Sequence, residues 1–216
     1  MFQKLTTTEQ AELQLANELL NVGLDAIPDD VVNLYGQVLP TSVYTVLLLE
    51  VVPRLTEPGS ESDYFTHERV RTWGVDPVMG GPEDPGTAYY RTFETPIGPD
   101  AHLYEVVVPM VPPSWNNRGR VAQYAATGTR VATAVAYSLL DVLQPAMDEG
   151  EDYYQHSVLT HFLLDGHHKM EAAAQTQTPI RLLSFIDERI SIASREDVTA
   201  VIHALSRRQQ ARTPQH

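Results

Sequence analysis

The residues best suited to chemistry lie in one short segment, residues 165–169, which reads Asp-Gly-His-His-Lys. The apolar run at 158–164 before it is typical of a buried strand, and residues 170–174 after it are good helix formers. The segment therefore joins the carboxyl end of a strand to the amino end of a helix. Backbone N–H groups are unpaired there and the helix dipole favours negative charge, so we expect the turn to bind a phosphate.

The side chains of this turn have separate predicted roles. Gly166 has no Cβ and would let the backbone approach a phosphate closely. Lys169 and either His167 or His168 would add charged or neutral hydrogen-bond donors. The alternative is an ordinary turn, in which Asp165 caps the helix and the two histidines lie in solvent.

A resemblance to a known family favours the phosphate-binding alternative. Residues 162–174, together with the Thr-Pro-Ile-Arg-Leu-Leu-Ser-Phe-Ile segment at 178–186, resemble a strand, turn, helix and returning strand of the ParB/sulfiredoxin-like superfamily. Its members include partition proteins that bind CTP, sulfiredoxins that use ATP, and free-serine kinases, and in them this turn holds nucleotide phosphates. Uncharacterised bacterial proteins carry a similar Asp-Gly-His-His-Arg run. The resemblance implies an α+β fold, with a mixed-sheet core at 101–210 and a helical and β extension at 1–100 in one compact unit.

The chain departs from the family in two ways. Lys169 stands where the family usually has arginine, which keeps the positive charge but loses the bidentate fork of a guanidinium. The chain also contains no cysteine, and the sulfiredoxin reaction needs a thiol. That reaction is therefore excluded.

The resemblance also implies functional residues outside the turn. Free-serine kinases place a catalytic glutamate in a His-Glu pair before the phosphate turn, and Glu68 follows His67 here. The alternative is a solvated helix face on which Glu68 pairs with an arginine. The segment 116–118 is similar to the Asn-x-Arg opening of the family's core, which implies that Asn116 and Arg118 contact the nucleotide. The alternative there is a proline-rich loop with a packed tryptophan.

The function implied by the resemblance is the binding of nucleotide phosphates, and we expect an ATP- or ADP-dependent small-molecule phosphotransferase. Positioning and charge neutralisation would supply most of the catalysis, with His167 or His168 stabilising the transferred group and Asp165 or Glu68 accepting a hydroxyl proton. The expected cofactors are ATP or another nucleotide with Mg²⁺, and the expected partner is a small-molecule acceptor. A nucleotide-dependent switch and a ParB-like scaffold that has lost its chemistry remain open as alternatives.

Histidine and carboxylate side chains crowd the same region, and both are ordinary ligands of zinc or iron. The residues concerned are His156, His161, Asp165, His167 and His168. His161 and the two histidines of the turn are separated by about 20 Å of extended chain. We therefore predict no metal site made by the protein alone, and favour a magnesium ion carried by the nucleotide.

Charge and composition limit the partners. A formal net charge of −13 argues against a protein whose main partner is a nucleic-acid backbone, because that affinity comes from clustered lysine and arginine. The amino end lacks the sustained apolar segment of a signal peptide, and no apolar run reaches the roughly 20 residues that span a bilayer. The absence of cysteine fits the cytosol. We expect a cytoplasmic protein that binds neither nucleic acid nor membrane, and a homodimer is left open.

The strands that would position the turn can also be predicted. Residues 42–52 form an apolar run typical of a central strand, although its pattern also allows a buried helix. Residues 89–93 and 103–108 are predicted to form a hairpin around a turn at 96–100. Proline and glycine recur across 53–99 and predict a long loop.

Four helices are predicted besides the one after the turn. Amphipathic patterns with capping residues indicate helices at 6–23 and 29–36. Apolar residues recur at helical spacing from 121 to 143 and predict the longest helix of the chain, with a small-residue face that packs on the sheet. A last helix is predicted to begin at Ser194, with Asp197 three residues later.

Overall fold

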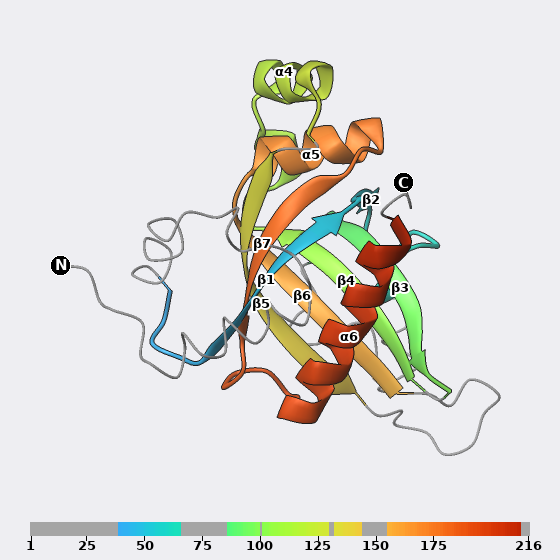
Figure 1. Ribbon diagram of the computed structural model, residues 1–216. Coiled ribbons are helices and arrows are strands. Elements are labelled where there is room, and N and C mark those ends of the chain that lie inside the picture. The colour runs from blue at the N-terminus through green and yellow to red at the C-terminus, as the bar shows by residue number, and fades with distance from the viewer. Residues whose placement is uncertain (1–38, 66–85, 100, 130–131, 144–154, 213–216) are drawn as a thin grey trace.

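A computed structural model describes residues 39–65, 86–99, 101–129, 132–143 and 155–212. These residues form a curved mixed sheet with a long helix across one face and two shorter helices at one end (Figure 1). The architecture is mixed α and β, which is compatible with the predicted α+β class. Among the described residues, no helix has the length and apolarity needed to cross a membrane.

The sheet has seven strands in the order β1-β7-β5-β6-β4-β3-β2. The pairs β4·β6 and β5·β7 are parallel and the other neighbours are antiparallel. Strands from both sides of residue 100 therefore belong to one sheet. In chain order the elements are β1 (Tyr44–Val51), β2 (Arg54–Thr56), β3 (Tyr89–Gly98), β4 (Ala101–Pro109), the 3-10 helix η3 (Pro113–Trp115), α4 (Arg118–Thr127), β5 (Thr133–Leu143), β6 (Gln155–Asp165), α5 (His167–Thr176), β7 (Ile180–Asp187) and α6 (Arg195–Arg212).

Most of the predicted elements that fall within the described residues are present. A strand is present at 42–52 as β1, but it lies at an edge of the sheet and not at its centre as predicted. The hairpin is β3 with β4, and β6 leads through the turn into α5. Helix α6 follows Ser194, whose hydroxyl donates to Asp197 Oδ2 over 2.7 Å. The hairpin turn is shorter than predicted, because Pro96 pairs with His102 inside the ladder. The helices predicted at 6–23 and 29–36 lie outside the described residues.

The prediction of one long helix from 121 to 143 is wrong. Helix α4 ends at Gly128, whose φ of 85° is unfavourable for other residues, and β5 then begins at Thr133. Strand β5 lies between β6 and β7 in the interior of the sheet. Neighbouring residues along it, such as Ala134 and Val135, are both buried. A strand covered on both faces is apolar at almost every position, so helical spacing fits it as well as strand spacing does.

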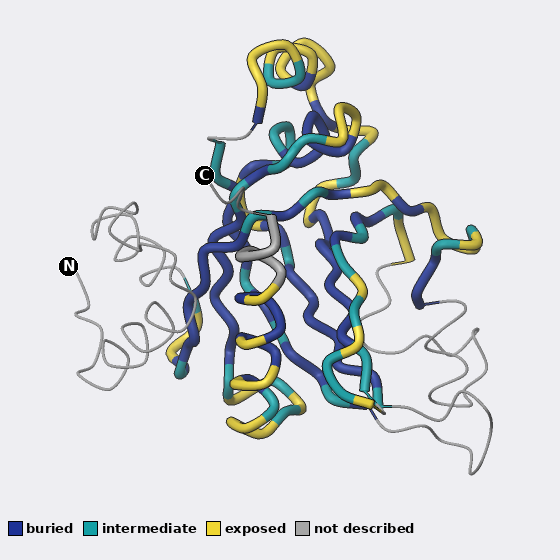
Figure 2. Tube along the Cα trace, turned by 45° about the vertical axis from the view of Figure 1, so that its right-hand side comes forward, coloured by how far each residue is buried: buried dark blue, intermediate teal, exposed yellow. Residues whose placement is uncertain are grey.

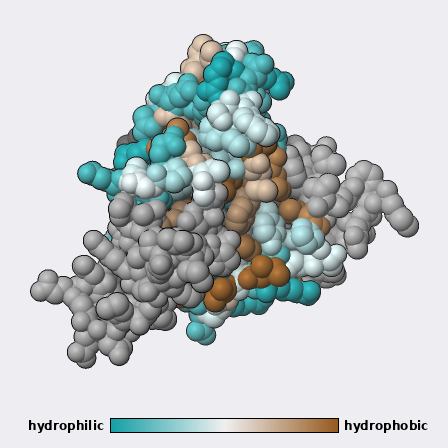
Figure 3. All heavy atoms as spheres, turned by 180° about the vertical axis from the view of Figure 1, so that it is seen from behind, coloured by the Kyte–Doolittle hydropathy of each residue, from teal (hydrophilic) through white to brown (hydrophobic). Residues whose placement is uncertain are grey.

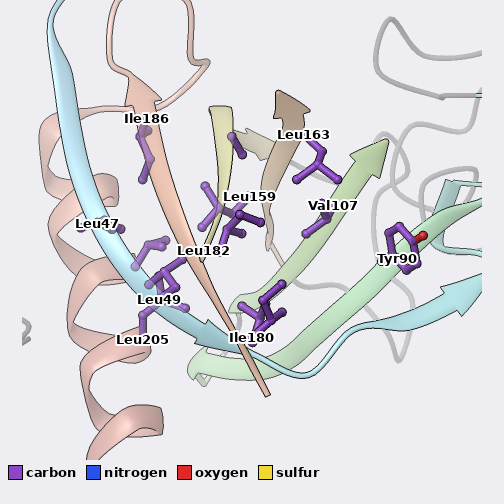
Figure 4. Close-up of a cluster of buried hydrophobic side chains, with 14 of the residues drawn as sticks. Leu47, Leu49, Tyr90, Val107, Leu159, Leu163, Ile180, Leu182, Ile186 and Leu205 are labelled. Atoms are coloured by element: carbon purple, nitrogen blue, oxygen red, sulfur yellow. The ribbon is translucent and has the colours of Figure 1, made fainter. Parts of the chain in front are cut away.

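The main core lies between the sheet and α6. Val201 and Leu205 of α6 pack in one buried cluster with Leu47 of β1 and Leu182 of β7 (Figure 4). The strands are buried over most of their length, whereas α4 is largely exposed (Figure 2). From behind, hydrophilic residues dominate the end of the molecule that carries α4, and apolar residues gather nearer its middle (Figure 3). On this face, the end that carries α4 is therefore hydrophilic.

A row of polar side chains crosses this core from strand to strand. Ser184 Oγ donates to Ser138 Oγ over 2.9 Å, and Ser138 Oγ lies 2.7 Å from His161 Nδ1. His161 Nε2 lies 3.5 Å from Glu105 Oε1, and Thr92 Oγ1 donates to Glu105 Oε2 over 2.7 Å. The composition is that of a hydrolase triad, but Ser138, His161 and Glu105 are all 0 % exposed and no substrate reaches them. The row is a buried polar network within the sheet.

Candidate functional site

A cleft of about 370 Å³ opens where β6 ends and α5 begins. Its size falls within the range of small-molecule sites. One wall is the turn at 165–169, and the other comes from the segment after β4 and from α4. The residues of the second wall are Val111, Trp115, Asn116, Arg120 and Tyr124.

The amino end of α5 forms the first wall. Gly166 is its N-cap, with φ 93° and ψ 19°, and no side chain caps the helix. Asp165 is therefore not the cap that the ordinary-turn alternative requires. The first backbone N–H groups of a helix have no intrahelical acceptor, and this first turn carries no acidic side chain. These groups are donors available to an anion.

Gly166 is required here mainly by its neighbour β5. A Cβ built on Gly166 would lie 2.8 Å from Ala134 Cβ and 2.9 Å from Ala134 Cα. The glycine thus permits both the left-handed backbone and the close approach of the turn to β5. A larger residue at this position would strain the backbone and would also collide with Ala134 of β5.

A second helix begins at the same cleft. Asn117 caps α4, because its Oδ1 accepts a hydrogen bond from the Arg120 N–H over 3.1 Å. The backbone N–H of Asn117 donates to His168 Nε2 over 3.1 Å, which ties the start of α4 to the start of α5. The first turn of α4 also lacks acidic residues. The positive ends of two helix dipoles therefore lie beside one cleft, and that of α4 already has its own side-chain cap.

Burial and hydrogen bonding act on the two histidines of the turn. Burial lowers the pKa of His167, nearby Asp165 raises it, and His168 lowers it. His167 Nε2 is buried and has no hydrogen-bond partner among the described residues. His168 accepts a hydrogen bond at Nε2, so its proton is on Nδ1 while that bond is formed. Each ring therefore offers one N–H donor.

The positive charge of the cleft comes from Lys169 and Arg120. Lys169 Nζ donates to the Thr133 carbonyl over 3.0 Å, which holds the ammonium group between the turn and the start of β5. Lys169 and the exposed Arg120 stand on opposite walls. A cleft with a cation on each wall suits an anion in a protein that is acidic overall.

Asn116 and Arg118, which we expected to contact a nucleotide, both donate hydrogen bonds to the buried carboxylate of Glu171. Asn116 Nδ2 donates to Glu171 Oε2 over 2.7 Å, and Arg118 Nη1 donates to Glu171 Oε1 over 2.5 Å. Asn116 still lines the cleft. Glu171 was not predicted from sequence, although a single acidic residue among Met and Ala on the buried side of a helix is a usable signal.

The remaining predicted residues have different positions. Glu68 lies outside the described residues, so its role stays a prediction. His156 stacks on Tyr104 with ring centroids 5.0 Å apart, and burial, helped by nearby His102, lowers its pKa to about 4. His161 belongs to the buried polar row. Of the histidines considered as metal ligands, only those of the turn reach the cleft.

The second wall contains residues that the sequence reasoning missed. Trp115, Arg120 and Tyr124 all line the cleft. Trp115 was assigned to a proline-rich loop, whereas Arg120 lay just before the predicted long helix and Tyr124 in its first turn. None of these assignments placed them near the turn at 165–169. Asn117 before a helical run was an available signal, because asparagine is a favoured N-cap.

A comparison of the chain with protein-family models, with curated proteins and with solved structures finds no match. The ParB/sulfiredoxin-like resemblance therefore stays a prediction carried by the residues of the turn and its flanking elements. What the protein does must be inferred from the cleft itself.

Proposed function

We propose that this protein binds the phosphate groups of a nucleotide in the cleft between α4 and α5, and transfers a phosphoryl group to a small hydroxyl-bearing acceptor. One observation carries the proposal: the N-terminus of α5, Lys169 and Arg120 line a single cleft beside the start of α4, in a chain of net charge −13. Helix N-termini with adjacent cations are favourable sites for phosphate.

Each cleft residue has a role in binding. The N–H groups of the first turn of α5 would hold one phosphate, with Lys169 beside it as a compact charge. Arg120 on the facing wall would form a bidentate pair with a second phosphate. Asp165 is the one carboxylate among the cleft-lining residues, so Mg²⁺ would be held mainly by phosphate oxygens and water. When bound, the ion would neutralise charge on the phosphates.

The transfer step needs a proton acceptor and charge stabilisation. The acceptor hydroxyl oxygen would bond to the terminal phosphorus as the bond to the bridging oxygen breaks, and the hydroxyl proton would pass to Asp165. The ring N–H groups of His167 and His168 would donate to the transferred group. Asp165 is exposed at the end of β6, where an acceptor can reach it.

Binding can be tested by thermal unfolding with ATP, ADP, CTP and GTP, with and without Mg²⁺. A nucleotide at 100 times its Kd should stabilise the protein by about 2.7 kcal/mol. Arg120→Gln should weaken that stabilisation, and Arg207→Gln, at an exposed arginine of α6, is the matched control. Lack of stabilisation by every nucleotide would refute the proposal.

Chemistry can be separated from binding by following phosphate transfer with phosphorus NMR, using amino-acid and sugar acceptors. His167→Ala and His168→Ala should lower turnover by about 10²-fold or more, as does loss of a donor to a transition state. Nucleotide affinity should change far less, because the contact matters most in the transition state. Binding without turnover would favour a nucleotide-dependent switch. Absence of both binding and turnover would favour a scaffold.

A further inference from the structure

We infer that the cleft contains a second subsite, in which Trp115 stacks on the flat face of the nucleotide's base and accepts different bases. This inference rests on the proposed function, which supplies the phosphate end of the ligand. It assigns the base of the nucleotide to Trp115, whereas the cationic end of the cleft accounts only for the phosphates.

The first observation is the exposure of Trp115. Its side chain lines the cleft and is 78 % exposed. Val111, which lines the same cleft, is 37 % exposed, so the indole shares the cleft with an exposed apolar side chain. An aromatic ring is a large apolar surface to leave in water. A planar ligand group that stacks on the ring would remove this apolar surface from water.

The second observation is the bracing of the turn that carries the ring. The Trp115 N–H donates to the Pro112 carbonyl over 2.9 Å, and the Asn116 N–H donates to the Pro113 carbonyl over 3.1 Å. Arg118 Nη2 also donates to the Pro113 carbonyl, and its guanidinium is held by Glu171. The ring thus stands on a preorganised support, so that binding orders little of the backbone.

The chemistry of the two ends selects the class of ligand. Lys169 and the first turn of α5 suit an anion, whereas Trp115 and Val111 suit a planar apolar group. A nucleoside phosphate has both groups, and the ring can stack on any base because every base has a π face. A sugar phosphate or free polyphosphate would use only the cationic end.

Base identity should matter little in this subsite. Asparagine side chains can form two hydrogen bonds with the edge of adenine, but the Asn116 amide already donates to Glu171. Arg120 is assigned to phosphate. Stacking area then decides the order, and we expect ATP and GTP to bind within about three-fold of each other and CTP more weakly.

Fluorescence of Trp115 tests the inference directly. The chain has two tryptophans, Trp73 and Trp115, so Trp73→Phe in the full chain leaves one indole. ATP, GTP and CTP should quench its emission, whereas tripolyphosphate should stabilise the protein without quenching. Trp115→Ala should weaken nucleotide binding by about 5- to 100-fold, and Trp115→Phe by much less. Affinity for tripolyphosphate should stay the same in both variants, and Ile190→Ala, at an exposed residue away from the cleft lining, should change nothing.

Thermal unfolding of the parent and of Trp115→Ala, without the change at Trp73, gives the same comparison if the single-tryptophan chain does not fold. Equal affinities for nucleotides and tripolyphosphate, unchanged in Trp115→Ala, would overturn the base subsite and leave the phosphate site standing. No stabilisation by either ligand would refute the phosphate site itself. A preference for ATP over GTP of more than about ten-fold would overturn the statement that different bases are accepted.

Discussion

Replacing Gly166 by alanine tests the geometry on which the cleft depends. The residue has φ 93°, in the left-handed region, and its added Cβ would meet Ala134 at 2.8 Å. The left-handed backbone should cost about 1–2 kcal/mol for a residue with a Cβ. Overpacking against β5 should add about 1–3 kcal/mol, because the nearest atoms include backbone. The free energy of unfolding should therefore fall by about 2–5 kcal/mol, and Tm by about 4–20 °C.

Gly59→Ala separates the two contributions. Gly59 has φ 76°, and a Cβ there would meet no atom within 4 Å, so this variant should lose only the backbone contribution. Urea unfolding followed by circular dichroism, with extrapolation to water, gives both values. Adding Ala134→Gly to Gly166→Ala removes the contact with Ala134 Cβ and should recover part of the lost stability. The recovery should be incomplete because the contact with the Cα of residue 134 at 2.9 Å remains. A Gly166→Ala loss no larger than that of Gly59→Ala would refute the close approach.

Three other predictions follow from buried groups. His156 has a pKa of about 4 in the folded state and an ordinary pKa of 6.5, so between these pH values only the unfolded state binds its proton. The free energy of unfolding should therefore fall by up to about 3 kcal/mol as pH drops from 6.5 to 4. Urea unfolding of His156→Phe should show a weaker dependence of this free energy on pH. His161→Leu should lower the free energy of unfolding by about 3–5 kcal/mol, since it removes one of the polar partners of buried Glu105; a loss below about 1 kcal/mol in urea titrations would contradict this. Glu171→Ala should speed amide hydrogen exchange in α4 and leave the sheet protected, because only Val121 of α4 is buried and the bond from Arg118 anchors the helix; equal exchange in both proteins would show that the anchor lies elsewhere.

Local signals in the chain were sufficient for the strand, turn and helix around Gly166. An apolar run, an Asp-Gly pair and a set of helix formers act over a few residues, so their meaning does not depend on distant contacts. The same holds for the capping pair Ser194 and Asp197 at the start of α6. Such signals also pointed to His167, His168 and Lys169, which line the cleft.

Strand β5 shows where local signals fail. Its residues carry apolar side chains at a spacing that suits a helix, and their strand conformation depends on pairing with β6 and β7. Those partners lie later in the chain, and no local pattern identifies them as neighbours of this segment. Tertiary pairing overrides the intrinsic preference of such a segment, because each backbone group of an interior strand is satisfied by a neighbour.

The second wall of the cleft was likewise decided only by the fold. Glu171 holds Asn116 and Arg118 across 55 and 53 residues of sequence, and His168 holds Asn117 across 51. These contacts bring the start of α4 beside the start of α5. A single helix N-terminus could be predicted from sequence because its signals are adjacent. The convergence of two could not, because it depends on hydrogen bonds that form only after the sheet has brought the segments together.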